Sequence, residues 1–432
     1  MLTSTPPQDT TRRPPRIARP DPLTRSADPA CPLPGPGGTE EFWAAVRSGG
    51  HPVVAPDPEG DDDHRAVTFL WQGTPATRAV QVLPNKLGDP RDPEVNMAAQ
   101  VPGTDVWHWT LRLRHDWRGT YDFYVDEGDG PEYGTPAYWQ WLRTRRRPDP
   151  LNPSALPRRW SGDPVSYAEL PAAPRAGDWL PRPDATARGR VAAHDVPAGN
   201  LGGSRRVWVY EPPLPAGHSA ADLPVLVLLD GEHWQPRLGL SHLLDNLIDD
   251  GRIPPVVALL PDSVDAGTRW ADLTCRPGFV SFLTDELLPW TAARLPVTDD
   301  PARTVVAGQS LGGLAAAHAA LSAPGRFGNV LVQSGSFWWP DGPDAEWLTG
   351  RIAQEPRLPV RFRLSFGEQE WVALPAARRL RDTLAAAGYD DATYHEFNGG
   401  HDYLCWRTEL ADGLVELLSP ATTGPGTRAP QP

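Results

Sequence analysis

The sequence predicts a two-domain protein in which a doubly wound α/β domain follows an antiparallel β-sandwich. Two observations carry this prediction. Apolar and polar residues alternate singly in the first part of the chain, whereas apolar strands alternate with helices in the second part. The chain of 432 residues is long enough for two domains with a substantial core.

The first domain is predicted over residues 38–165. In the run AVTFLWQG, the side chains of Val67, Phe69 and Trp71 share one face, and VWHWTLRLR and GTYDFYVDEG repeat the same alternation. A period of two bounded by Gly, Pro and Asp is typical of antiparallel strands with one buried face. We therefore expect an immunoglobulin-like (E-set-like) β-sandwich. Because this segment contains no catalytic constellation, we expect the domain to position a substrate.

The second domain is predicted over residues 190–420. The expected strands are RRVWVYEPP, LPVLVLLDG, PPVVALLPD, RTVVAG, NVLVQSGS, VRFRLSFGEQE and ATYHEFNGG, and the expected helices are FVSFLTDELLPWTAARL, SLGGLAAAHAALSAPGRFG, LPAARRLRDTLAAAGYD and a last one ending near Leu418. This order is typical of a doubly wound sheet. A proline-rich linker is expected at 166–189, and disordered tails are expected at 1–37 and 421–432.

Composition excludes several classes of partner. The formal net charge of −13 argues against nucleic acid or an anionic membrane surface. No stretch reaches the ~18 apolar residues of a membrane helix, and no secretion signal is visible, so we expect a cytoplasmic protein. Cys31, Cys275 and Cys405 form neither a disulfide framework nor a metal-ligand pattern, and no metal site is predicted. The sequence specifies no oligomeric state.

Ser310 is the predicted nucleophile. Gly308-Gln309-Ser310-Leu311-Gly312 fits the pattern G-x-S-x-G between an expected strand and an expected helix. The glycines allow a sharp turn that lifts the serine hydroxyl above the sheet and leaves the first helix amides facing it. This context predicts an α/β-hydrolase fold for the second domain.

A serine nucleophile needs a base, and in this fold the chain order is serine, acid, histidine. His401 is the expected base, because it follows the last strand and two glycines. His395 lies inside that strand and is expected to pack or face solvent. Glu370 is the favoured acid and Glu368 the alternative, with a Ser–His dyad also open; Asp402 adjoins His401 too closely in sequence to face it.

Acyl transfer also requires donors for the oxyanion. We expect the backbone N–H of Leu311 to supply one of them. The loop after the early strand LLDGEHW is expected to supply the second, from Gly231 or Glu232.

Five motifs together resemble the enterochelin (ferric-enterobactin) esterase family: LLDGEHW, RWADLTCRPGFVSFLTDELLPW, AGQSLGGLAA, QSGSFWW and GGHDYLCWR. In the first domain, GTYDFYV and RRRPDPLNP resemble that family's N-terminal β-sandwich, so the likeness spans about 38–418. Members of the family are cytoplasmic enzymes that cleave tricatecholate siderophores to release iron. The resemblance implies that Ser310 attacks an ester of a serine trilactone, that His401 relays the proton, and that water releases the acyl enzyme.

The family's ligand is a trianionic ferric catecholate, and the resemblance therefore implies a site lined by arginines and aromatic side chains. The candidates are Arg269, Trp234, Trp338, Trp339, Arg143 and Arg145, with Arg146 and Arg147 in the same basic run. No cofactor is expected, since the iron would arrive with the substrate.

Three other functions remain open from the sequence. A carbohydrate-ester (feruloyl or acetyl) esterase or a mycolyl-type acyltransferase would share the serine motif and the fold. An inactive siderophore-binding protein would keep the fold without turnover.

Overall fold

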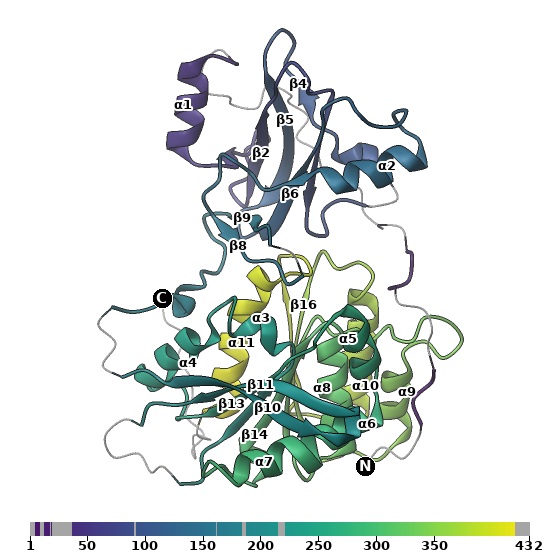
Figure 1. Ribbon diagram of the computed structural model, residues 1–432. Coiled ribbons are helices and arrows are strands. Elements are labelled where there is room, and N and C mark those ends of the chain that lie inside the picture. Colours follow the sequence, from purple (N-terminus) through teal and green to yellow (C-terminus); the bar gives the residue numbers. More distant parts are fainter. Residues whose placement is uncertain are drawn as a thin grey trace.

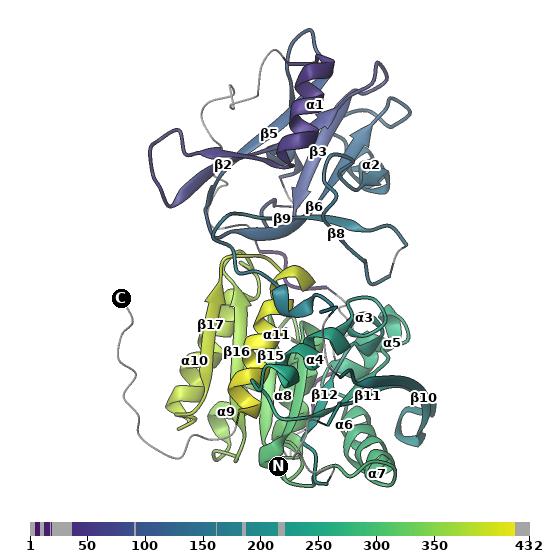
Figure 2. The ribbon, with the colours of Figure 1, turned by 90° about the vertical axis from the view of Figure 1, so that its left-hand side faces the viewer.

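The computed structural model describes residues 5–8, 13–17, 19, 37–89, 92–160, 162–183, 187–214 and 221–419. The predicted tail at 421–432, and most of the one at 1–37, lie outside the described residues. The described chain forms two domains, and the smaller sandwich domain is stacked on one end of the larger C-terminal domain (Figures 1 and 2).

The sandwich domain consists of two antiparallel sheets, with strand orders β1-β2-β5-β4 and β3-β6-β9-β8 and with β7 paired to β6. Its elements are α1 (Glu40–Gly49), β1 (Val53–Pro56), β2 (His64–Gln72), β3 (Ala79–Pro84), β4 (Ala99–Gln100), β5 (Val106–Arg114), β6 (Arg118–Asp126), α2 (Pro136–Leu142), β7 (Arg146–Arg147), β8 (Ala155–Leu156) and β9 (Val165–Glu169).

The alternation in β2 produces the expected inner face. Val67, Phe69 and Trp71 are buried between the two sheets. The opposite face of β2 is also buried, since Leu70 packs under helix α1. The domain extends past the predicted boundary at residue 165, because β9 pairs with β6 from Ser166 to Glu169.

The C-terminal domain is built on an eight-stranded sheet of order β10-β11-β13-β12-β14-β15-β16-β17. The strands are parallel from β13 to β17, and β10 and β11 are antiparallel at one edge. Their bounds are β10 (Arg190–Ala198), β11 (Gly203–Glu211), β12 (Val225–Leu228), β13 (Val257–Pro261), β14 (Thr304–Gln309), β15 (Asn329–Gln333), β16 (Arg361–Gly367) and β17 (Thr393–Phe397). The predicted doubly wound fold is confirmed.

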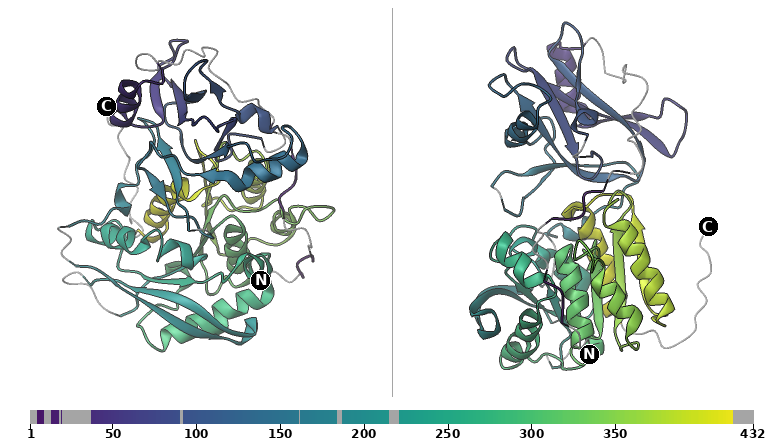
Figure 3. Two further views of the ribbon diagram at one scale, coloured as in Figure 1. Left: turned by 45° about the horizontal axis from the view of Figure 1, so that its top comes forward. Right: turned by 90° about the vertical axis from the view of Figure 1, so that its right-hand side faces the viewer.

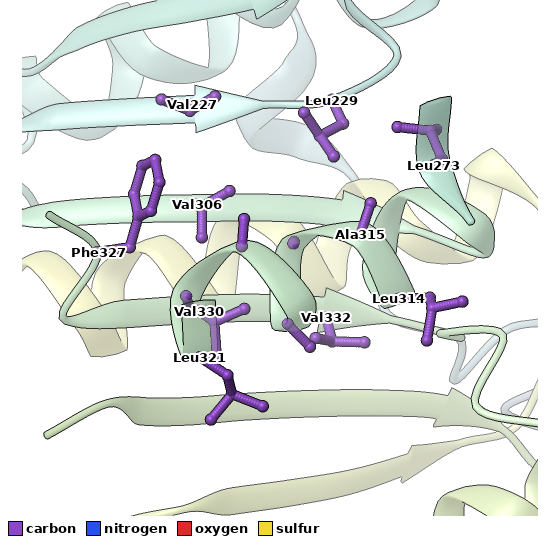
Figure 4. Packing of buried hydrophobic residues seen from close by; sticks show 14 of the residues in the cluster. Val227, Leu229, Leu273, Val306, Leu314, Ala315, Leu321, Phe327, Val330 and Val332 are labelled. Atoms are coloured by element: carbon purple, nitrogen blue, oxygen red, sulfur yellow. The ribbon is translucent and has the colours of Figure 1, made fainter. Parts of the chain in front are cut away.

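Helices cover both faces of this sheet. They are α3 (Gly231–Trp234), α4 (Leu240–Asp249), α5 (Ala266–Leu273), α6 (Pro277–Ser281), α7 (Leu288–Ala292), α8 (Leu311–Ser322), α9 (Trp347–Gln354), α10 (Leu374–Ala386) and α11 (Tyr403–Leu418). Helices α4 and α11 pack on one face, and α5 to α10 pack on the other. Figure 4 shows Leu314 and Leu321 of the central helix α8 among the valines of β14 and β15.

The segment predicted as a linker is held by the C-terminal domain. Trp179 is buried, its indole stacks on Trp234, and its Nε1–H donates to the carbonyl of Arg407 at 2.9 Å. No helix within the described ranges is long and apolar enough to cross a membrane.

Two glycines give a matched test of the packing between β14 and α8. A Cβ on Gly308 would lie 2.4 Å from the backbone of Gly312, whereas a Cβ on Gly350 in α9 would meet nothing within 4 Å. We expect Gly308→Ala to lower the free energy of unfolding by at least about 1 kcal/mol, because backbone must move. Gly350→Ala should raise it by up to about 1 kcal/mol. Chemical denaturation measures both, and equal effects would contradict the packing described.

Candidate functional site

Ser310 sits on a strained turn at the carboxyl end of β14. Its backbone has φ 58° and ψ −123°, a conformation that non-glycine residues rarely adopt. The turn is held from both sides, because Ser310 N–H donates to the carbonyl of Gln333 and Ser310 C=O accepts from the N–H of Ser336, each at 3.0 Å. The close approach of Gly308 and Gly312 is what allows α8 to start at Leu311. The hydroxyl of Ser310 lines a cavity between the domains.

His401 lies on the loop after β17 and lines the same cavity. Its Nδ1 is hydrogen-bonded to Oε2 of Glu370 at 2.5 Å, and its ring packs edge-on against Trp406. With Nδ1 bonded to a carboxylate, Nε2 is left to accept a proton. The hydroxyl of Ser310 lies 3.5 Å from that of Ser336 in this conformation. Bonds between a catalytic serine and its base often tighten only when substrate binds.

Glu370 is buried behind His401, with a 1 % exposed side chain. Its Oε1 accepts from the hydroxyl of Ser334 at 2.5 Å and from the N–H of Gly367 at 2.8 Å, and Trp406 Nε1–H donates in turn to Ser334. Burial raises the pKa of Glu370, but the charge of His401 and these hydrogen bonds outweigh it, and the pKa lies below its usual value. The carboxylate is therefore ionised and fixed in orientation.

The other titratable candidates have different partners. Glu368 forms a half-exposed ion pair with Arg114, and His395 in β17 pairs with Glu409. Asp402 accepts from the backbone and side chain of Thr120, each at 3.0 Å. Among Glu370, Glu368 and Asp402, only Glu370 is hydrogen-bonded to the imidazole of His401.

The cavity has a volume of about 440 Å³ and is lined from both domains. Four arginines contribute to its wall: Arg146, Arg158, Arg159 and Arg269. The exposed Trp160, which follows Arg159 in the sequence, lines the cavity as well. Three of these arginines are ion-paired with carboxylates behind the wall: Arg158 with Asp122, Arg159 with Asp230 and Glu232, and Arg269 with Asp230. The carboxylate of Asp402 also lines the cavity.

The buried carboxylate of Asp230 holds two of these arginines. Arg269 donates to both of its oxygens at 2.8 and 2.7 Å, and Arg159 from the sandwich side donates to the same carboxylate and to Glu232. Gln309, next to Ser310, donates to Asp230 at 2.6 Å. Burial alone would raise the pKa of Asp230, but the two guanidinium groups hold it below its usual range.

The backbone groups expected to bind an oxyanion lie at helix starts. Leu311 is the first residue of α8 and Gly231 the first of α3, so their N–H groups have no partner within the helix. Glu232 is the second residue of α3, and its side chain is engaged by Arg159.

The structure corrects most of the expected substrate contacts. Arg269 lines the cavity, but Trp234 is fully buried beneath it, where its indole N–H donates to Gln309. Trp338 and Trp339 lie in the core under the helices, not on an aromatic wall, because their rings are needed to fill space against that face of the sheet.

The predicted basic run also turns away from the cavity in part. Arg143 is exposed, Arg145 pairs with Asp129, and Arg147 pairs with Glu127, whereas Arg146 lines the cavity.

Four further residues on the wall were not among the predicted contacts. Arg159 and Trp160 belong to the short run RRW at 158–160, a basic–aromatic signal that the basic run at 143–147 overshadowed. Tyr403 lies in the motif GGHDYLCWR, and nothing else in the sequence marks it as a wall residue. Its hydroxyl accepts a hydrogen bond from the side-chain amide of Gln309. His233 lines the cavity in neutral form, because burial and the charges of nearby arginines lower its pKa to about 3.

Removing the charge of Asp230 tests the buried cluster. We expect Asp230→Asn to lower the free energy of unfolding by about 3–5 kcal/mol, because two largely buried guanidinium groups lose their partner. The control Asp129→Asn breaks the exposed pair with Arg145 and should cost less than about 1 kcal/mol. Denaturant titration measures both, and similar losses would contradict the role of Asp230.

The lowered pKa of Glu370 gives a pH-dependent prediction. A carboxyl whose pKa is depressed on folding contributes stability that is present above its ordinary value of 4.5 and is lost as the pH falls through the depressed value. The difference in unfolding free energy between wild type and Glu370→Gln should therefore shrink below about pH 4.5. Denaturation of both proteins across the acid range measures it. A difference that stays constant or grows on acidification would exclude an ionised, stabilising Glu370.

Comparison with known proteins places this geometry in a family. Residues 66–179 match the family model described as enterochelin esterase, N-terminal, and residues 198–417 match the one described as putative esterase. An iron(III) enterobactin esterase from Dickeya dadantii is 34% identical over 417 residues, covering 88% of this chain and 93% of the relative.

Two solved structures are similar over nearly the same range. The ferric enterobactin esterase of Salmonella typhimurium has a TM-score of 0.76 and 32% identity, covering 88% of this chain and 98% of that one. The enterobactin esterase of Shigella flexneri, solved in the presence of enterobactin, has a TM-score of 0.74 with the same identity and coverage. The serine turn, its buried Glu–His pair and these matches across both domains together establish that the chain belongs to the enterochelin esterase family.

Proposed function

We propose that this protein is a serine esterase that hydrolyses the trilactone esters of a ferric tricatecholate siderophore such as enterobactin. The observation that carries the proposal is that Ser310, the Glu370–His401 pair and four arginines meet at one cavity. The family supports the same reaction, since a relative of this chain was solved in the presence of enterobactin.

In the first half of the proposed reaction, Ser310 Oγ attacks an ester carbonyl while His401 Nε2 takes its proton. Glu370 keeps the imidazole in the tautomer with Nδ1–H and stabilises the imidazolium that forms. The carbonyl oxygen becomes an oxyanion, which we assign to the N–H of Leu311 and to an N–H of Gly231 or Glu232. Each such donor is worth about 2.7–4 kcal/mol. The imidazolium then protonates the departing ester oxygen of the substrate's seryl unit as its C–O bond breaks, leaving an acyl enzyme.

In the second half, His401 takes a proton from water, and the hydroxide attacks the acyl carbon. Collapse of the second tetrahedral intermediate returns the proton to Ser310 and releases a carboxylic acid. One water is consumed for each ester bond cleaved.

The guanidinium groups on the cavity wall support an anionic substrate. Arg159 and Arg269 are held rigidly by Asp230, so they lose little side-chain entropy on binding. Trp160 stacks with Arg159 at the rim and offers a flat surface for a catechol ring. We assign substrate recognition to these three residues with Arg146 and Arg158.

We also propose that the reaction uses no resident cofactor and takes place in the cytoplasm. The iron is cargo of the substrate. Free, buried thiols at Cys275 and Cys405 support a reducing compartment.

A matched pair of carboxyl variants tests the catalytic assignment. With ferric and iron-free enterobactin as substrates, Ser310→Ala should lower kcat by at least about 10³-fold, and Glu370→Gln by about 10²–10⁴-fold. Glu368→Gln, two residues away but paired with Arg114 at the surface, should leave kcat unchanged. Chromatography with mass spectrometry follows the linear trimer, dimer and monomer.

Each competing function has its own outcome in this experiment. Serine-dependent hydrolysis of a simple aryl ester without cleavage of enterobactin would transfer support to a carbohydrate-ester esterase or acyltransferase. Binding of enterobactin without turnover of any ester would identify an inactive binding protein. Turnover that survives Ser310→Ala would remove the serine mechanism.

A further inference from the structure

The loop that carries His401 is held by the sandwich domain as well as by its own. Asn85, which follows β3 of the sandwich, forms two hydrogen bonds with the backbone of His401. Its Oδ1 accepts from His401 N–H and its Nδ2 donates to His401 C=O, each at 3.0 Å. Both polar backbone groups of His401 are thus bound by one side chain 316 residues away in the chain.

The fit around Asn85 is close. A Cβ on Gly400 would lie 2.5 Å from the carbonyl oxygen of Asn85, so only glycine permits this approach. Asn85 is itself fixed to the sandwich, since its N–H donates to the carbonyl of Thr120 at 2.8 Å. The side chain therefore extends from a strand end with little freedom to move.

Neighbouring contacts hold the same loop and the loop of Glu370. Thr120 donates twice to Asp402, and Asn398 donates to Asp116. Trp117 Nε1–H donates to Gln369, next to Glu370, at 3.1 Å. Figure 2 shows α11 reaching the end of the C-terminal domain that lies beneath the sandwich, and the right-hand view of Figure 3 shows the two domains stacked in this way. The sandwich thus contacts both loops that carry the Glu370–His401 pair.

We infer that Asn85 is a positioning residue that fixes the peptide of His401, so that the sandwich domain takes part in proton transfer as well as in substrate binding. The inference rests on the proposed role of His401 as base. Rotation of the His401 peptide would move the imidazole relative to Ser310, and a displacement near 1 Å at a reacting group can cost about 10²-fold in rate.

The test uses the full-length protein and substrates too small to need the sandwich domain. Asn85→Leu removes both hydrogen bonds and keeps a side chain branched at the same position. Two readouts are measured: kcat and KM for p-nitrophenyl acetate, and the rate at which a fluorophosphonate labels Ser310. We expect kcat and the labelling rate to fall together by at least about tenfold while KM for the small ester stays unchanged.

Arg114→Gln is the control, since it removes a half-exposed ion pair across the same interface without touching His401. It should leave both readouts unchanged. Should Asn85→Leu fail to fold, as judged by circular dichroism, Asn85→Ser removes the same two hydrogen bonds without an apolar branch and is measured in its place.

Three outcomes decide the inference. Parallel losses with Asn85→Leu, absent in Arg114→Gln, support it. Wild-type rates on the small ester, with or without a raised KM for enterobactin, overturn it and leave the esterase reaction intact. Full activity of His401→Ala would instead overturn the proposed function, so the two failures are distinct.

Discussion

The buried carboxylate of Asp230 is the interaction on which the rest of the site depends. It joins Arg159 from the sandwich side, Arg269 from α5 and Gln309 from the serine turn, three segments that no other single side chain described above connects. The start of α8 also packs against it, since a Cβ on Gly312 would lie 3.3 Å from Oδ2. One charge thus sets the position of two arginines and supports the strained turn of Ser310.

This arrangement explains how a strongly acidic protein can present fixed guanidinium groups at a cavity. An unpaired arginine would be free to move and would remain fully hydrated. Pairing with a buried carboxylate partly neutralises the guanidinium charge, but it fixes the N–H donors of the arginine in one place. Fixed arginine donors suit the substrate that we propose, because that substrate carries several negative charges on a rigid frame.

The catalytic residues could be predicted from the sequence because each of them lies on the loop that directly follows one strand. Ser310, His401 and Glu370 each follow a parallel strand, and the carboxyl ends of such strands meet at one edge. The choice between Glu370 and Glu368 required burial, which a spacing of two residues does not reveal. Strand β10 was not predicted, because an exposed antiparallel edge strand leaves only a weak apolar pattern.

Contacts between the domains could not be predicted. Asn85 and Arg159 have no local pattern that marks them, since their importance comes from the surface of the other domain. Trp338 and Trp339 were candidates for the cavity wall because aromatic side chains suit a catechol ring. Large aromatic side chains suit a hydrophobic core equally well, and the structure places both tryptophans in the core.

The measurement that tests the central claim most directly is detection of the acyl enzyme. The protein is mixed with ferric enterobactin, quenched in acid within the first turnover, digested and analysed by mass spectrometry. We expect an ester adduct of linear trimer on the peptide that contains Ser310. Release of linear trimer with no adduct at that serine, or with an adduct on another residue, would contradict it.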